Sequence, residues 1–137
     1  MYLRGGVTAV SLRFVTSDPV HLSITHSQFT DFVPTESNAN LVVVSPGPVS
    51  GKLHVLLQDV TFSENHLQAG GGLFKIDVQV DTTVNMDGVV VIKNSIASTT
   101  TTNGLFGFTR SGPSSPPFSL SFHQVNFTQN SVANGRG

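Results

Sequence analysis

The sequence contains no cysteine and no tryptophan among its 137 residues. Without cysteine the chain cannot form a disulfide framework or a thiolate-ligated structural zinc site, which are common ways of stabilising a small domain. The lack of cysteine does not indicate the cellular compartment, because it suits both a protein of the reducing cytosol and an exported protein that folds without disulfides.

Charge is also scarce, since charged residues make up 11% of the chain and the formal net charge is −1. The seven basic residues are scattered and nearly balanced by eight acidic ones, which excludes a polybasic nucleic-acid-binding module. Mean hydropathy is slightly positive at +0.10. We therefore do not expect charge repulsion to keep this chain unfolded.

Long hydrophobic runs are missing as well. No purely aliphatic run is longer than that of Leu41 to Val44, which is far short of the roughly 20 apolar residues that a membrane-spanning helix needs. Glycine, threonine, serine and arginine interrupt the apolar residues of the first fifteen positions. We therefore expect no membrane-spanning helix and see no signal peptide in this stretch.

The residues that are abundant favour β-strands. The chain has 19 Val, 14 Thr and 10 Phe, against 5 Ala, 2 Glu and 3 Lys. β-Branched and aromatic residues pack well on a pleated sheet, whereas alanine, glutamate and lysine are typical of helices. This composition excludes a helical bundle or a coiled coil.

Internal repeats are the most informative feature of the sequence. Four segments align without gaps, beginning at His21, His54, Gly88 and Ser119. Their large apolar anchors, separated by 33, 34 and 31 residues, are Phe29, Phe62, Ile96 and Phe127. A second set of anchors keeps a similar period and consists of Val7, Leu41, Leu73 and Leu105, preceded by Gly6, Asn40, Gly72 and Gly104. Two markers with one period indicate a true repeat.

Within each repeat the chemistry alternates as in a strand with one buried face. The alignment predicts one buried stack of Leu22, Val55, Val89 and Leu120. Turn-forming segments rich in Pro, Gly, Asn and Asp follow each second strand. A β-propeller blade usually needs more residues than one of these repeats offers. A β-sandwich does not require equivalent residues to match from one repeat to the next, so both folds fit the sequence less well than a β-helix.

The sequence therefore predicts an all-β fold, a right-handed parallel β-helix solenoid of about four coils of 31 to 34 residues. We divide it into a partial coil at 1–19, coils at 20–52, 53–86 and 87–117, and a partial coil at 118–137. The first coil lacks its opening strand and the last stops before its second strand. We accordingly expect an uncapped fragment of a longer solenoid, which associates with itself through its uncapped ends.

Two unit ends resemble a known family. Phe62-Ser63-Glu64-Asn65 followed by Gly71-Gly72-Leu73, and Phe127-Thr128-Gln129-Asn130 followed by Asn134-Gly135, resemble the F-x-x-N and G-G-A-[ILV] repeats of chlamydial-type polymorphic outer membrane proteins. More broadly the chain resembles right-handed β-helix, pectin-lyase-like proteins. The segments at Phe29 and Ile96 depart from the motif. The resemblance implies an exported, repetitive surface region that is often adhesive.

Equivalent residues of successive coils form columns in which chemistry could be shared, because stacked coils bring them to about 4.8 Å from one another. One outward polar column is predicted to contain His26, Asp59, Lys93 and Gln124. It offers a base, an orienting carboxylate and a cation, or simply a solvated face. His21 and His54 share a second column, but Gly88 and Ser119 supply no third metal ligand, so we predict a surface pair.

The remaining motifs have simpler explanations than a ligand site. Asn65 and Asn130 are predicted to play a structural role at a corner, with Thr99 interrupting any ladder between them. Gly47 to Leu53 resembles a phosphate loop, but it has the wrong spacing and no Ser or Thr after Lys52. Gly70 to Asp77 does not fit a calcium-binding nonapeptide. Asn126-Phe127-Thr128 fits a glycosylation acceptor, which has meaning only in a eukaryotic secretory pathway.

Two classes of function remain open. The first is a non-enzymatic, adhesin-like segment at the cell surface or outside the cell, binding a glycan, a receptor or a partner protein. The alternative is a carbohydrate-active lyase or hydrolase, whose chemistry needs clustered carboxylates. Asp59, Asp77, Asp81 and Asp87 do not share columns in the alignment. We therefore predict no catalytic, cofactor-binding or metal-binding residues, and no nucleic-acid partner.

Overall fold

The computed structural model describes residues 8–47, 51–97, 104–110 and 116–133 as an all-β chain. Its strands, in chain order, are β1 (Thr8–Phe14), β2 (Val20–Thr30), β3 (Asn40–Pro46), β4 (Lys52–Ser63), β5 (His66–Leu67), β6 (Gly72–Val78), β7 (Asp81–Asp87), β8 (Val90–Ile92), β9 (Ser95–Ile96), β10 (Phe106–Arg110), β11 (Phe118–His123), β12 (Asn126–Thr128) and β13 (Ser131–Val132). Every pairing among these strands is parallel.

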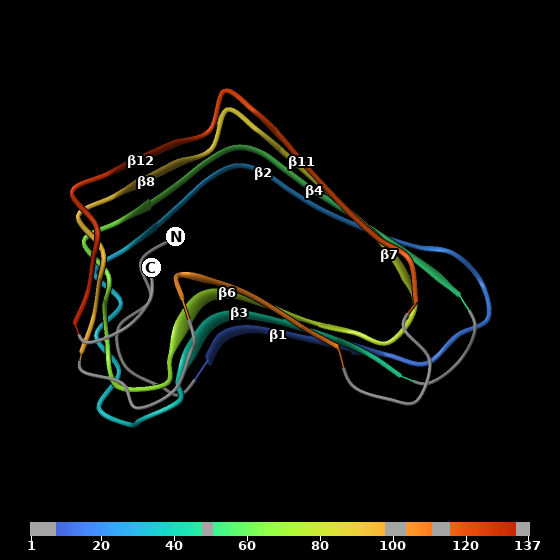
Figure 1. Cartoon of the computed structure of the whole chain (residues 1–137), viewed down its shortest axis with the longest axis horizontal. Helices are drawn as coiled ribbons and strands as arrows, with labels where there is room; N and C mark the ends of the chain where they lie inside the picture. Colours follow the sequence, from blue (N-terminus) through green and yellow to red (C-terminus); the bar gives the residue numbers. More distant parts are fainter. Residues whose placement is uncertain (1–7, 48–50, 98–103, 111–115, 134–137) are drawn as a thin grey trace.

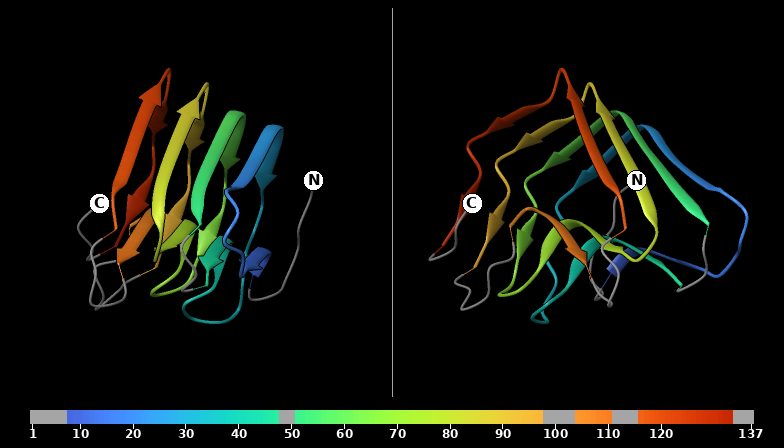
Figure 2. Two further views of the ribbon diagram at one scale, coloured as in Figure 1. Left: turned by 90° about the vertical axis from the view of Figure 1, so that its right-hand side faces the viewer. Right: turned by 45° about the vertical axis from the view of Figure 1, so that its right-hand side comes forward.

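The strands form a parallel β-solenoid of about three turns with three sheets (Figure 1). One sheet has the order β1-β3-β6-β10, and a short sheet has the order β13-β9-β5. The remaining sheet has the order β11-β7-β4-β8-β12, with β2 also paired to β4. Figure 2 shows successive coils lying side by side along the solenoid. The parallel β-helix prediction is confirmed at this level.

Two tight corners shape each coil, and each corner is a single residue with positive φ. The first corner column consists of His26, Asp59, Gly88 and Gln124, with φ between 47° and 64°. The second consists of Asp31, Glu64, Lys93 and Gln129, with φ between 55° and 57°. This left-handed backbone is unfavourable for residues with a Cβ, and short polar side chains and glycine tolerate it best. Each corner turns the chain within one residue without ending the coil.

The corner columns correct the predicted polar column. His26, Asp59 and Gln124 do share a corner, but Gly88 stands between the last two. Lys93 belongs to the second corner, where its ammonium lies 3.7 Å from the Glu64 carboxylate. The predicted combination of His, Asp and Lys in one column is therefore wrong.

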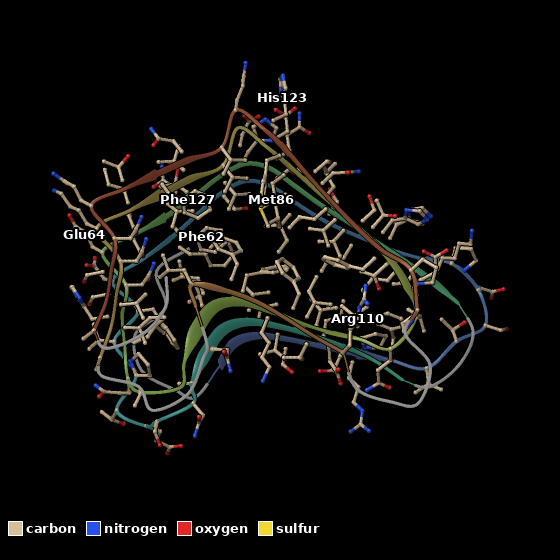
Figure 3. All side chains as sticks on the ribbon, in the orientation of Figure 1. Phe62, Glu64, Met86, Arg110, His123 and Phe127 are labelled. Carbon is tan, nitrogen blue, oxygen red and sulfur yellow. The ribbon has the colours of Figure 1, made fainter. Side chains whose placement is uncertain are left out.

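The hydrophobic core fills the space between the sheets. In Figure 3, Phe62 and Met86 point inward, whereas Glu64 and His123 point away from the core. Phe29 stacks on Phe62 with ring centroids 5.2 Å apart. The strands β3, β6 and β10 add the inward column of Val42, Phe74 and Phe106.

The predicted buried stack is right in three of its four positions. Leu22 pairs with Val55, Val55 with Val84, and Val84 with Leu120. Val84 therefore occupies the place predicted for Val89, which is buried five residues further along, just past the first corner. The anchor column contains Val91 between Phe62 and Phe127, whereas Ile96 aligns with Leu67 and Val132.

The second set of anchors is partly confirmed. Asn40 pairs with Gly72, as the repeat predicted. At β1, however, Thr8 and not Gly6 pairs with Asn40, so the chain enters this sheet two residues later than predicted. The predicted anchor Val7 lies outside the described residues.

A ladder of asparagines, two of them buried, lines the second corner and overturns the interrupted arrangement predicted from the sequence. Asn94 fills the position between Asn65 and Asn130, while Thr99 is not among the described residues. The Nδ2 of Asn65 donates to Oδ1 of Asn94 at 2.8 Å, and that of Asn94 donates to Oδ1 of Asn130 at 3.0 Å. Each Nδ2 also donates to a main-chain carbonyl, those of Phe29, Phe62 and Val91.

Unequal coil lengths explain why the alignment missed Asn94. The separations along this ladder column are 33, 29 and 36 residues, counted from Phe32, whose N–H donates to Asn65 Oδ1. One short and one long coil compensate each other, so the ends of the chain align correctly while the middle shifts by five residues. The segment from Lys52 to Asn65 and its counterpart from Asp81 to Asn94 both span thirteen positions. The variation in coil length therefore lies outside this segment, in the connections between sheets.

Candidate ligand-binding surface

The outer face of the β1-β3-β6-β10 sheet carries two adjoining hollows. One has a volume of about 300 Å³ and is lined by Ser11, Arg13, Ser45, Pro46, Gly47, Asp77 and Gln79. The other has a volume of about 240 Å³ and is lined by Val43, Ser45, Lys75, Asp77 and Thr109. Because they share Ser45 and Asp77, they form one shallow groove that crosses the strands along the solenoid.

The parallel register brings the charged groups of this groove together from separate coils. Arg13 pairs in register with Ser45, and Asp77 with Thr109. Lys75 stands two residues before Asp77 on β6, so both side chains project from the same outer face. The Gln79 side chain donates to Asp77 Oδ2 at 2.6 Å. Cationic donors and a carboxylate acceptor therefore lie on one open polar surface.

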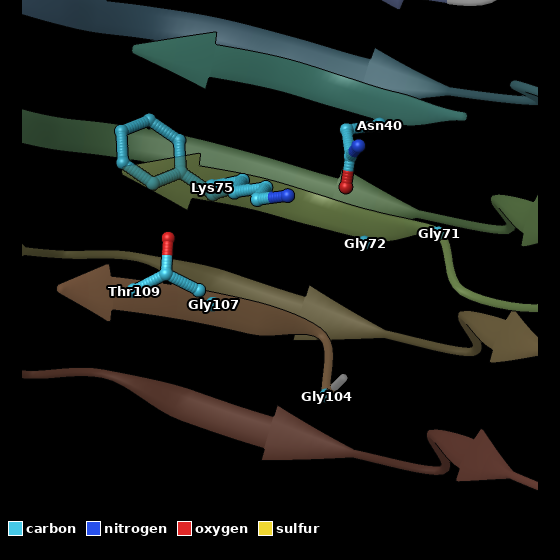
Figure 4. A pocket seen from close by; sticks show the side chains of 8 residues that line it. Asn40, Gly71, Gly72, Lys75, Gly104, Gly107 and Thr109 are labelled. Atoms are coloured by element: carbon cyan, nitrogen blue, oxygen red, sulfur yellow. The ribbon is translucent and has the colours of Figure 1, made fainter. Parts of the chain in front are cut away.

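Glycines keep the neighbouring end of the groove open. Figure 4 shows Lys75 and Thr109 beside Gly72, Gly104 and Gly107, which line a further small hollow. A Cβ on Gly72 would stand 3.2 Å from the carbonyl oxygen of Gly104 and 3.3 Å from Asn40 Oδ1. A larger residue there would crowd both coils. The small glycines thus leave room for this hollow, which Asn40 also lines.

Histidine and aspartate pair along the first corner, at the crest of the molecule in Figure 3. His26 Nε2 lies 3.3 Å from Asp59 Oδ2, and His123 Nδ1 lies 2.7 Å from Asp87 Oδ1. All four side chains are substantially exposed. Only the pair of His26 and Asp59 was predicted from the sequence, where both residues fall in the outward polar column. Exposed pairs of this kind fit the solvated-face interpretation better than a desolvated catalytic site.

The second predicted histidine column is confirmed as a stacked pair. The rings of His21 and His54 lie 4.9 Å apart with an interplanar angle of 10°. Thr83, not Gly88, follows His54 in register. Within the described parts of the chain no cluster of three or more His, Cys, Asp or Glu residues could hold a metal ion.

The remaining sequence motifs have simple structural settings. Lys52 opens β4, a strand rather than a helix, and its ammonium lies 3.5 Å from Asp81. Residues 48–50 of the phosphate-loop resemblance lie outside the described ranges. Asn126 is exposed on β12, and its Oδ1 accepts a hydrogen bond of 2.6 Å from the Thr128 hydroxyl.

The register also locates the four aspartates considered for catalysis. Asp81 pairs with Lys52, Asp87 with Gln58 and His123, and Asp77 with Thr109. The side chain of Asp59 lies over Gly88, since a Cβ there would be 2.6 Å from Asp59 Oδ1. The register therefore places these four carboxylates in separate columns.

Comparisons with known proteins identified no relative of this chain. No protein-family model, curated protein sequence or solved structure matches the chain. The resemblance to pectin-lyase-like proteins and to polymorphic outer membrane protein repeats therefore receives no support beyond the parallel β-solenoid itself. Among the described residues, no helix is long and apolar enough to cross a membrane.

Proposed function

We propose that this chain is a non-enzymatic, adhesin-like binding segment that acts at the cell surface or outside the cell. Its ligand is an extended, hydroxyl-rich glycan that lies along the groove on the β1-β3-β6-β10 sheet. The observation that carries the proposal is the continuous groove shared by Arg13, Lys75 and Asp77 across several coils.

The shape of the groove suits a chain-like ligand better than a small, enclosed one. It is open and shallow, and its polar groups recur from coil to coil along the solenoid. Serine and threonine hydroxyls, a carboxylate and two cations offer both donors and acceptors. A sugar chain presents hydroxyls at regular spacing, so several weak contacts add up without a deep pocket.

Lysine substitutions provide a direct test. We expect Lys75→Ala to weaken binding by about tenfold, which corresponds to the loss of one charged hydrogen-bonding group. The matched control is Lys93→Ala, which removes an exposed lysine at the second corner, away from the groove. Binding is measured by titration calorimetry with neutral and acidic oligosaccharides identified on a glycan array. Equal loss in both variants, or no binding to any glycan, contradicts the proposal.

The same samples test the enzymatic alternative. Release of reducing or unsaturated sugars from a panel of polysaccharides, abolished by Asp59→Ala, would identify a hydrolase or lyase. Under the binding proposal, no sugar is released from any glycan that binds.

A further inference from the structure

The small hollow at the glycine end of the groove is shared by three coils. Its lining comes from β3, β6 and β10 and from residues just before these strands: Asn40, Gly71, Gly72, Phe74, Lys75, Gly104, Gly107 and Thr109. It adjoins the open groove, because Lys75 and Thr109 line both. Its volume is about 10 Å³, which is the space of one water-sized or methyl-sized group. The groove therefore has a recess for a single small substituent.

Two of the glycines in this recess are required neither by backbone conformation nor by packing. Neither Gly104 nor Gly107 has the positive φ that favours glycine. A Cβ on Gly104 would be 3.8 Å from the Phe106 carbonyl oxygen, and a Cβ on Gly107 would be 3.9 Å from Lys75 Cγ, with no closer contact outside the chain neighbours. Glycine weakens a strand interior and often marks a place where a ligand approaches the backbone closely.

Asn40 directs an amide oxygen into the recess. Its Nδ2 donates to the main-chain oxygen of Asn38 at 2.9 Å, which fixes the orientation of the amide. A Cβ on Gly72 would be 3.3 Å from Asn40 Oδ1, and in Figure 4 this oxygen points toward Gly72. An amide oxygen accepts hydrogen bonds through two lone pairs. The recess therefore contains an oriented acceptor for an N–H group.

Lys75 and Thr109 bring hydrogen-bond donors to the same recess. In Figure 4 the Lys75 side chain extends toward Asn40. An ammonium and a hydroxyl can both donate to a carbonyl oxygen. Phe74 and the glycines supply apolar surface between the polar groups. An acceptor, a donor and an apolar wall thus lie together around a space of methyl size.

We propose that this recess holds the acetamido group of an N-acetylated amino sugar in the bound glycan. The N–H of that group donates to Asn40 Oδ1, and its carbonyl oxygen accepts from the Lys75 ammonium. Its methyl group lies against Gly104 and Gly107. The inference rests on the glycan-binding function proposed above, and it narrows the ligand to glycans that contain such a sugar.

The other common substituents of sugars match the recess less well. A hydroxyl group carries no methyl to cover the apolar wall. An ionised carboxylate has acceptors only, so it cannot donate to Asn40 Oδ1. The acetamido group has one donor, one acceptor and one methyl, and leaves no polar group of the recess without a partner.

Two oligosaccharides separate this inference from the proposed function. Chitotetraose and cellotetraose have the same linkage between sugars and differ only in the acetamido group on each sugar. We expect titration calorimetry to show about tenfold tighter binding of chitotetraose, because it adds a buried methyl and a hydrogen bond at the recess. A glycan array of further pairs that differ only in this group extends the comparison to other linkages.

Substitutions in the recess show where the preference arises. Gly107→Val fills the recess with a side chain that suits a strand and meets no close contact. We expect it to weaken chitotetraose binding about tenfold and to change cellotetraose binding by less than about twofold. Asn40→Ala removes the acceptor and should have the same selective effect. Ser119→Val is the matched control, because Ser119 is exposed on β11, in a different sheet.

Circular dichroism establishes that the variants are folded, and the outcomes then distinguish the two proposals. The acetamido assignment is overturned if acetylated and unacetylated glycans of every pair bind equally, or if folded Gly107→Val keeps the full preference. Either result leaves the glycan-binding proposal intact. If no glycan binds, both proposals are overturned.

Discussion

The two corners of the solenoid solve the same geometric problem in different ways. At the first corner the side chains of His26, Asp59 and Gln124 lie in solvent, and the column also accepts Gly88. At the second corner the turning residues are equally exposed, but the next position is an amide in three successive coils, buried at Asn65 and Asn94 and half-buried at Asn130. The backbone turns alike at both corners. What differs is how the buried polar groups beside each turn are satisfied.

This difference predicts unequal sensitivity to substitution. Asn65 and Asn94 are 0% and 1% exposed, and their side chains hydrogen-bond to main-chain groups of neighbouring coils. No buried side-chain nitrogen or oxygen in the described residues lacks a hydrogen-bond partner. Removing one amide from this ladder therefore leaves several buried groups unpaired, whereas removing an exposed corner side chain leaves none.

Asn94→Ala is expected to have the largest effect. It removes the acceptor for Asn65 N and Nδ2 and the donor to Phe62 O, all buried. At about 1–3 kcal/mol for each unpaired buried group, with partial relaxation, the free energy of unfolding should fall by about 3–5 kcal/mol. Urea denaturation followed by circular dichroism measures the loss. Asn85→Ala, at an exposed position on β7, is the control and should cost less than about 1 kcal/mol.

Gly88→Ala is expected to have an intermediate effect at the first corner. Gly88 has φ of +64°, and an added Cβ would stand 2.6 Å from Asp59 Oδ1. Because that carboxylate is exposed and able to move, the main cost is the left-handed backbone, about 1–2 kcal/mol. Gly88→Asn should cost less, since asparagine tolerates this conformation. Equal denaturation midpoints for the two variants would contradict this explanation.

His123→Ala is expected to have the smallest effect. The His123 and Asp87 side chains are 72% and 45% exposed, and solvent screens their interaction. The free energy of unfolding should change by less than about 1 kcal/mol. Thermal unfolding at low and high salt measures it, and a loss as large as that of Asn94→Ala would remove the distinction between the corners.

The sequence was sufficient to predict stacked parallel strands but not their complete register. The alternation around Leu22, Val55 and Leu120 identified a buried face, because apolar residues at every second position are typical of a strand with one side in the core. The constant-period assumption then misplaced Val89 and Ile96. A local pattern could have found the true register: Asp59-Val60-x-Phe62-x-Glu64-Asn65 has its counterpart in Gly88-Val89-x-Val91-x-Lys93-Asn94.

The groove on the β1-β3-β6-β10 sheet could not be predicted from the repeats, for a different physical reason. Arg13, Ser45 and Asp77 are unlike one another, so no repeated letter marks their column. Their proximity depends on the register between coils, which the sequence alignment did not give in full. Repetition in the sequence is visible beside the anchors of the first strand, and the predicted polar columns lie there.

The short connections from the β1-β3-β6-β10 sheet back to the next coil suggest a use for the fold in protein engineering. They comprise five residues between β3 and β4, two between β6 and β7, and seven between β10 and β11. The solenoid thus already tolerates different lengths at this edge while the strands stay in register. Because the entropy cost of lengthening a loop grows only logarithmically, about 0.6 kcal/mol per doubling, foreign peptides could be inserted here in successive coils. Such insertions would form a row of displayed epitopes at the spacing of adjacent strands, about 4.8 Å.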